Sequence, residues 1–252
     1  ERGQLRLGDR VTRYLPEFGR QGKNGVTIRH LLTHTSGLPD MLPDNVALRE
    51  ANAPLSEFVR RTCEIKLDFP PGRGVQYQSM GFAVLGEVIS RVAGVDCAEF
   101  LRSELFEPLG MTSIVPEFDA AGTLIGGSLM HATARDYARF GDFLRNKGSY
   151  RGTQLVPRAW VEKMVTPSPE SAQYGFQTWL NRPVKGMTGA EHPLFPDRAP
   201  HSLFAMIGHM GQYVLISPSK KLTMVRLGHS DAAQRKAMLQ QAADVIELYP
   251  ES

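Results

Sequence analysis

Residues 27–40 read TIRHLLTHTSGLPD and predict a short helix followed by a sharp turn. Thr27 is placed to cap this helix, because its side-chain oxygen can accept a hydrogen bond from a backbone N–H of the first turn. Gly37 can adopt a positive φ and Pro39 cannot continue a helix, so we expect the helix to end in a loop. His30 and His34 lie four residues apart on one face of this segment.

The two histidines allow two interpretations. A His pair at this spacing binds zinc in helices where a glutamate follows the first His and acts as general base. Here Leu31 follows His30, and no nearby acidic cluster offers a third ligand. A metal hydrolase using His30 and His34 is therefore the weaker alternative, and we expect neither a metal nor another cofactor. The stronger interpretation is a scaffold in which the imidazoles bond to backbone groups.

Composition narrows the class of protein. The chain has 252 residues, of which 42% are hydrophobic and 22% charged, values that suit a globular domain spanning 1–252. The formal net charge is +3 and the 29 Lys and Arg residues are scattered, so we expect no nucleic-acid partner. The apolar runs are too short for a membrane span. Cys63 and Cys97 are too few for a disulfide framework.

The order of elements predicts an α+β fold. Helical spacing of apolar residues is found over 53–65, 80–94, 96–111, 133–148 and 231–249. Short segments rich in β-branched and aromatic residues predict strands over 174–181, 202–211, 212–219 and 221–229. We therefore expect a mostly helical region over 20–165, then an antiparallel sheet with a covering C-terminal helix over 170–252.

Two further motifs carry chemical groups. In VQYQSMG, residues 75–81, Tyr77 and Ser79 precede a helix, whose dipole favours a developing negative charge there. Tyr77 can act as a general base only if a neighbouring cation lowers its pKa. In GHMGQY, residues 208–213, His209 to Gly211 fall on a predicted strand, where exposed backbone N–H groups can stabilise an oxyanion.

Together the motifs resemble one family. LLTHTSGL at 31–38, PPG at 70–72, YQS at 77–79, LG at 85–86 and GHMG at 208–211 occur in the order seen in penicillin-binding-protein-like serine hydrolases. These include class C β-lactamases, D-alanyl-D-alanine peptidases, related carboxylesterases and nylon-oligomer hydrolases. The resemblance extends over most of the chain and implies a β-lactamase/transpeptidase-like fold: an antiparallel sheet flanked by helices, with a mostly helical subdomain.

The resemblance also implies roles for individual residues. Tyr77 takes the position of the catalytic tyrosine, and Ser79 that of an asparagine that holds the substrate. His209 to Gly211 fill the strand motif, with His209 catalytic, Gly211 at the substrate and the Gln212 N–H as one oxyanion donor. Trp179, Tyr174 and Phe204 allow two interpretations: they line a pocket for the acyl group, with Trp179 the candidate substrate-binding residue, or they pack in the core or the sheet, which is the stronger interpretation.

The nucleophile of the family is a Ser-x-x-Lys at the start of a helix. Ser217 to Lys220 match this pattern by letter, but Pro218 and the flanking strands predict a hairpin turn. The resemblance places the motif, and the strands that accompany it, ahead of Glu1. We therefore expect the intact protein to be a serine hydrolase acting through an acyl-enzyme, and this chain alone to be inactive. The alternative is a catalytically inactive binding or regulatory module on the same fold.

Two departures from the family pattern bear on the substrate. His209 stands where β-lactamases carry a Lys that attracts a carboxylate, and Ser79 is shorter than the usual Asn. Both favour a small ester or amide over a β-lactam substrate. The sequence indicates no compartment and no oligomeric state.

Overall fold

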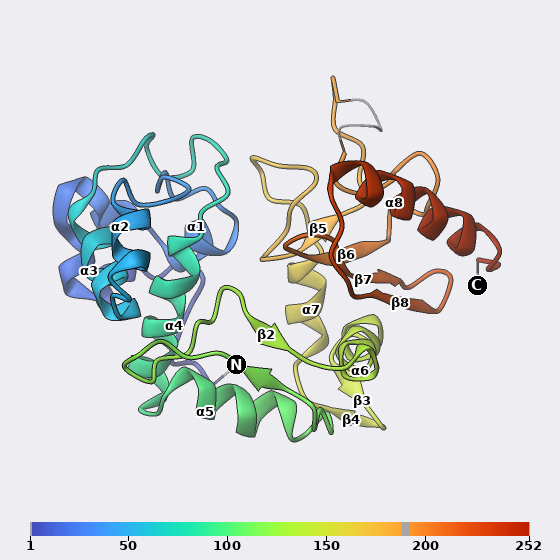
Figure 1. The fold of residues 1–252 in the computed structure, drawn as a ribbon, viewed down its shortest axis with the longest axis horizontal. Helices are drawn as coiled ribbons and strands as arrows, with labels where there is room; N and C mark the ends of the chain where they lie inside the picture. The colour runs from blue at the N-terminus through green and yellow to red at the C-terminus, as the bar shows by residue number, and fades with distance from the viewer. Residues whose placement is uncertain (1, 188–191, 252) are drawn as a thin grey trace. The chain divides into compact units, whose positions relative to one another are not determined.

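The computed structural model describes residues 2–187 and 192–251, which form two compact units (Figure 1). The first unit comprises Glu1–Pro108 and Ser113–His131, and the second comprises Leu109–Thr112 and Ala132–Ser252. Within the described ranges, every helix is too short or too polar to cross a lipid bilayer. Each unit is described below on its own.

The first unit is mainly helical. Its core is built from apolar side chains that are almost completely buried, among them Phe18, Leu31 and Val84. Its elements are η1 (Val11–Arg13), η2 (Pro16–Gly25), α1 (Ile28–Leu32), α2 (Asn45–Glu50), α3 (Leu55–Glu64), α4 (Met80–Ala93), α5 (Cys97–Leu101), η3 (Arg102–Phe106), β1 (Val115–Pro116) and β2 (Met130–His131).

Helix α1 begins where the sequence predicts. The Thr27 hydroxyl accepts from the His30 N–H at 3.3 Å, and His30 Nδ1 accepts from the Thr27 N–H at 3.2 Å. This reciprocal pair satisfies two backbone donors that the first helical turn leaves open. The prediction that Thr27 caps the helix is confirmed, and one nitrogen of His30 is occupied by that cap.

The turn that follows α1, residues 33–40, is bonded to the segment 68–79 along most of its length. The chain begins to reverse at His34, whose φ is 57°. The carbonyl groups of the turn accept hydrogen bonds from amides of the segment at 2.7–3.2 Å: Asp68 to Gly37, Gly72 to Thr35, Gln76 to His34 and Ser79 to Asp40. The turn therefore fixes the path of the chain that leads into α4.

Gly37 makes this close approach possible. Its φ is 81°, and a Cβ on Gly37 would lie 2.0 Å from the carbonyl oxygen of Phe69. A backbone atom cannot move aside as a flexible side chain can, so only glycine fits.

The second unit contains a four-stranded antiparallel sheet of order β5-β6-β7-β8. Figure 1 shows helix α8 lying along this sheet. The elements of the unit are α6 (Ala134–Arg145), β3 (Ser149–Tyr150), β4 (Thr153–Gln154), α7 (Arg158–Met164), β5 (Trp179–Leu180), β6 (Phe204–Gly208), β7 (Gln212–Ser217), β8 (Leu222–Arg226) and α8 (Ala232–Glu247).

Strand β7 is buried on both faces because a helix covers each of them. Tyr213 and Leu215 belong to the apolar cluster that includes Ala242 and Ile246 of α8. Val214 and Ile216, which alternate with them, lie on the side of α6, where a Cβ on Gly141 would come within 3.0 Å of Val214 Cγ1. Residues alternate between the two faces of a strand, so the period of two accounts for both contacts.

Most of the predicted elements are present. The four strands, the C-terminal helix and the hairpin turn after Ser217 are confirmed, since β7 and β8 pair antiparallel with Ser217 opposite Leu222. The short helices α2 and α7 were not predicted. The helices packed on an antiparallel sheet and the separate, mainly helical unit confirm the α+β prediction.

Gly37→Ala should destabilise the first unit much more than Gly22→Ala. Gly22 has the same φ of 81°, but a Cβ there would meet nothing within 4 Å. We expect about 1–2 kcal/mol for the backbone strain at Gly22, and roughly 2 kcal/mol more at Gly37 for the clash with Phe69. Urea unfolding of both variants measures the difference; equal losses would show that the contact with Phe69 is unimportant.

Candidate active site

Tyr77 lies in a cluster of three rings in the first unit. Its ring centroid is 4.4 Å from that of His34 and 6.1 Å from that of Phe82, and the His34 and Phe82 rings are 5.7 Å apart. His34 is 2% exposed, whereas Tyr77 is 45% exposed. A buried imidazole thus supports a tyrosine that solvent or a substrate can reach.

Gln78 holds the segment from the opposite side. Its side chain is fully buried, and its Oε1 accepts from the Ser36 hydroxyl at 2.6 Å. Its Nε2 donates to the carbonyl of Leu31 at 3.3 Å. Successive side chains of an extended segment point to opposite sides, so a buried Gln78 leaves Tyr77 on the exposed side. Gln78 is not among the residues predicted from the sequence, although its place between Tyr77 and Ser79 in YQS is a signal that could have indicated it.

Ser79 immediately precedes helix α4, which begins at Met80. Its N–H donates to the carbonyl of Asp40 at 3.2 Å, so the turn over 33–40 places Ser79 as well as Tyr77. A hydroxyl here lies at the positive end of a 14-residue helix.

The charge states of the ring cluster follow from burial. Burial and, second, the Asp40 carboxylate raise the pKa of Tyr77, and both favour the neutral phenol. Burial lowers the pKa of His34 to about 4, so its imidazole is neutral at neutral pH. A base role for Tyr77 therefore requires a cation that outweighs burial and Asp40.

The prediction that His209 lies on a strand is wrong. Strand β6 ends at Gly208 and β7 begins at Gln212, which pairs with Gly208 across the hairpin. The chain reverses between them because Met210 and Gly211 adopt φ values of 56° and 94°. The GHMG motif is therefore the tight turn of the β6–β7 hairpin, with His209 exposed and Gly211 buried.

Gln212 ties this turn to the loop after β8. Its Oε1 accepts from the Gly228 N–H and its Nε2 donates to the Gly228 carbonyl, both at 2.8 Å. The Ser230 N–H also donates to the carbonyl of Met210 at 2.9 Å. The side chain of Gln212 thus bonds to backbone, and its own N–H is the group with a predicted chemical role.

Trp179 packs as part of the second unit. Its ring meets that of Tyr174 edge-on at 4.9 Å, and its partly buried side chain adjoins the apolar cluster of the sheet and α8. Tyr174 and Phe204 are themselves buried, 5% and 3% exposed. A role of Trp179 in binding an acyl group stays a prediction.

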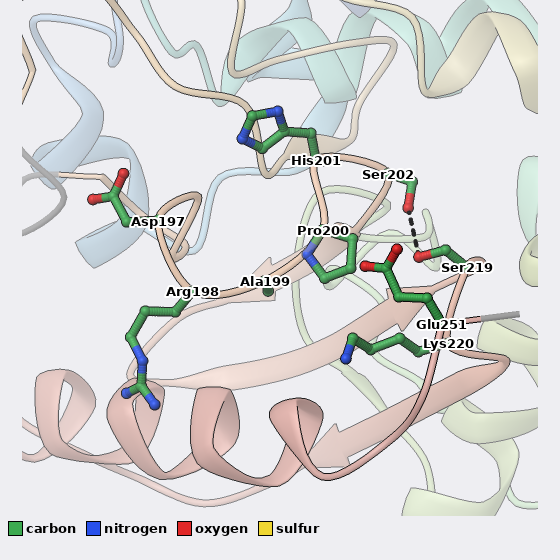
Figure 2. A pocket seen from close by; sticks show the side chains of 9 residues that line it. All are labelled: Asp197, Arg198, Ala199, Pro200, His201, Ser202, Ser219, Lys220 and Glu251. Carbon is green, nitrogen blue, oxygen red and sulfur yellow. Dashed lines mark hydrogen bonds between the residues drawn. The ribbon is translucent and has the colours of Figure 1, made fainter.

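Elsewhere in the second unit, a cavity of about 490 Å³ is widely open to solvent (Figure 2). Ser202 donates to Ser219 across it at 3.2 Å, and Lys220 donates to the carbonyl of Tyr249 at 2.6 Å. Its described lining includes Ser219 and Lys220 of the hairpin turn that matches Ser-x-x-Lys by letter, but none of the predicted site residues.

Each unit brings together part of the predicted set. Tyr77 and Ser79 lie two residues apart just before α4 of the first unit, and His209, Gly211 and Gln212 lie at the β6–β7 hairpin turn of the second. In residues 2–187 and 192–251, no three His, Cys, Asp or Glu side chains are grouped so that they could hold a metal ion.

Comparison with known proteins identifies the family. The model of the Beta-lactamase family matches residues 1–246, and the chain belongs to that family. Esterase EstB of Burkholderia gladioli is 40% identical over 127 residues, covering 44% of this chain and 32% of EstB. Penicillin-binding protein 4* of Bacillus subtilis strain 168 is 37% identical over 115 residues, covering 44% of this chain and 25% of that protein. The matched stretches thus span a third or less of these two relatives.

A solved structure shows the same fold. EstCE1, described as a hydrolase with promiscuous acyltransferase activity, has a TM-score of 0.74 to this chain at 19% identity, covering 97% of this chain and 79% of that one. The family and the β-lactamase-like fold predicted from the motifs are both confirmed.

His34 should make the first unit less stable in acid. The folded protein keeps His34 neutral down to about pH 4, whereas the unfolded chain protonates it near 6.5, so the free energy of unfolding falls as the pH drops between these values. The full effect is roughly 3 kcal/mol. Urea unfolding at several pH values should show a shallower decline in the free energy of unfolding for His34→Asn, because the titrating imidazole is removed. Asn is the suitable replacement because it tolerates the positive φ at this position. His131→Asn, which removes an exposed histidine, is the control; identical declines in all three proteins would contradict the assignment.

Proposed function

We propose that the intact protein is a serine hydrolase that cleaves small esters or amides through an acyl-enzyme. The observation that carries the proposal is the placement of Tyr77 and Ser79 just ahead of α4 by the turn over 33–40. Membership of the Beta-lactamase family and the similarity to a protein named an esterase support it.

The proposed mechanism assigns one step to each group. The nucleophile is the serine of a Ser-x-x-Lys motif ahead of Glu1, and it attacks the substrate carbonyl. Tyr77 and the lysine of that motif share the proton transfers, with the ammonium lowering the pKa of Tyr77 against the effects of burial and Asp40. The Gln212 N–H stabilises the oxyanion. The ester C–O or amide C–N bond then breaks, and the alcohol or amine leaves with the proton supplied by Tyr77 or the lysine. Water finally attacks the acyl-enzyme, which releases the carboxylic acid and the free serine.

The surroundings of Tyr77 and Ser79 support an uncharged substrate. The Asp40 carbonyl accepts from the Ser79 N–H, and the Asp40 carboxylate raises the pKa of Tyr77, second to burial. A negative charge here disfavours a substrate carboxylate. Together with His209 in place of Lys and Ser79 in place of Asn, this charge favours esters and small amides over β-lactams.

Tyr77→Phe should lower turnover of a nitrophenyl ester by about 100-fold or more, because it removes the hydroxyl that transfers the proton. Tyr249→Phe is a matched control, since Tyr249 is 44% exposed and Tyr77 is 45% exposed. Thermal unfolding should be the same for both variants. Equal turnover by Tyr77→Phe and the control would remove Tyr77 from the mechanism.

The nucleophile can be located directly. Treating the intact protein with a fluorophosphonate, and separately with a penicillin, should give an adduct that mass spectrometry maps to a Ser-x-x-Lys serine ahead of Glu1. We expect the fluorophosphonate to react much faster than the penicillin. Labelling of Ser217 would overturn the assignment of the nucleophile, and the absence of any adduct together with no ester turnover would favour the inactive binding module.

A further inference from the structure

Arg226, the last residue of β8, forms a fork of hydrogen bonds around the β6–β7 turn. Its Nη1 donates to the carbonyl of Gly211 at 2.7 Å and also to the carbonyl of Gly228. Its Nη2 donates to the Ser230 hydroxyl at 2.5 Å. One guanidinium thus joins the hairpin turn to both ends of the loop over 228–230.

The bond to Gly211 has a consequence for Gln212. The Gly211 carbonyl and the Gln212 N–H belong to one planar peptide group, in which they point in opposite directions. A donor that holds the carbonyl therefore fixes the direction of the N–H. In the proposed function, this N–H is the group that stabilises the oxyanion.

The rest of the turn supports the same peptide orientation. Gln212 bonds to Gly228 through both of its side-chain polar atoms, so the next residue is tied to the same loop. A Cβ on Gly211 would lie 3.1 Å from Arg226 Nη1, and φ there is 94°. Glycine thus serves two needs: the positive φ of the turn and the close approach of the guanidinium.

The geometry points to Arg226 as a positioning residue that orients the Gln212 N–H for oxyanion stabilisation, an inference that rests on the proposed function. Arg226 contacts neither the nucleophile nor the substrate carbonyl in the proposed mechanism, and it acts through the Gly211–Gln212 peptide. The planar guanidinium presents several donors in fixed directions, whereas a lysine ammonium is a single flexible point of charge. Arg226→Lys should therefore keep part of the function, and Arg226→Met should lose more.

The kinetic test uses the intact protein and a nitrophenyl ester. Arg226→Met should lower kcat by about 10- to 100-fold, below the loss expected when an oxyanion donor is removed, because the N–H is misdirected and still present. KM should stay within about twofold, since the interaction is made in the transition state. Arg226→Lys should fall between Arg226→Met and the unmodified protein.

Arg198→Met is the matched control. Arg198 forms a comparable fork in the same unit, to Gln240, Asp244 and Glu247 of α8, away from the hairpin turn. It should lose as much thermal stability as Arg226→Met while keeping kcat. Equal kcat values for the two variants would overturn the positioning role.

Amide hydrogen exchange provides a readout that does not depend on activity. The Ser230 amide, which donates to the Met210 carbonyl of the turn at 2.9 Å, should exchange faster in Arg226→Met than in Arg198→Met, and unchanged exchange would contradict the inference. An intact protein that neither hydrolyses the ester nor reacts with a fluorophosphonate would overturn the proposed function, and the catalytic role of Arg226 with it. Normal turnover that Arg226→Met leaves intact would overturn only the role of Arg226.

Discussion

The backbone pairing between the turn over 33–40 and the segment over 68–79 is the constraint on which the first unit depends. Four amides of the segment are satisfied by carbonyl groups of the turn, and the positive φ values of His34 and Gly37 shape the turn that presents these carbonyls. Each such bond contributes about 0.5–1.5 kcal/mol net, and leaving a buried carbonyl unpaired costs more. The pairing is therefore both stabilising and specific in register.

The motif that contains His30 and His34 acts on its neighbours largely through its backbone. Its contribution is made through backbone carbonyls, through the ring of His34 beneath Tyr77 and through Ser36 on Gln78. The hairpin turn of the second unit is also held by side chains that bond to backbone. Arg226 donates to the Gly211 carbonyl, and Gln212 accepts from the Gly228 N–H. In both units, side chains that do no chemistry themselves set the position of loop groups that can.

The sequence predicts the parts of the fold that rest on local rules. Helix α4 ends at Gly94, with φ of 71°, as a glycine stop predicts, and α6 begins after Thr133, whose side chain accepts from Asp136 N–H. The strands were recognised from their alternating β-branched residues, and β7 fits because both of its faces are covered. Helix α2 escaped prediction because six residues give little periodicity and its N-cap Asp44 makes no side-chain cap bond.

The candidate site was harder to predict, because its supports are tertiary. The letters GHMG suggest a strand, and only the φ values of Met210 and Gly211 show that they form a turn. The burial of Gln78 depends on Ser36, 42 residues away in sequence, and the fork of Arg226 on Gly211, 15 residues away. Tyr77 and Ser79 were identified from the family pattern, and their surroundings show why a neutral phenol is the resting form of Tyr77 in this unit.

Hydrogen exchange of the amides of Asp68, Gly72, Gln76 and Ser79 tests the central claim most directly, because these are the four donors of the pairing. The account predicts that they exchange as one group, with protection close to that of the amides of α4, although none of the four lies in a helix or strand. Exchange at the rates of an open loop, or with unrelated rates for the four amides, would contradict it.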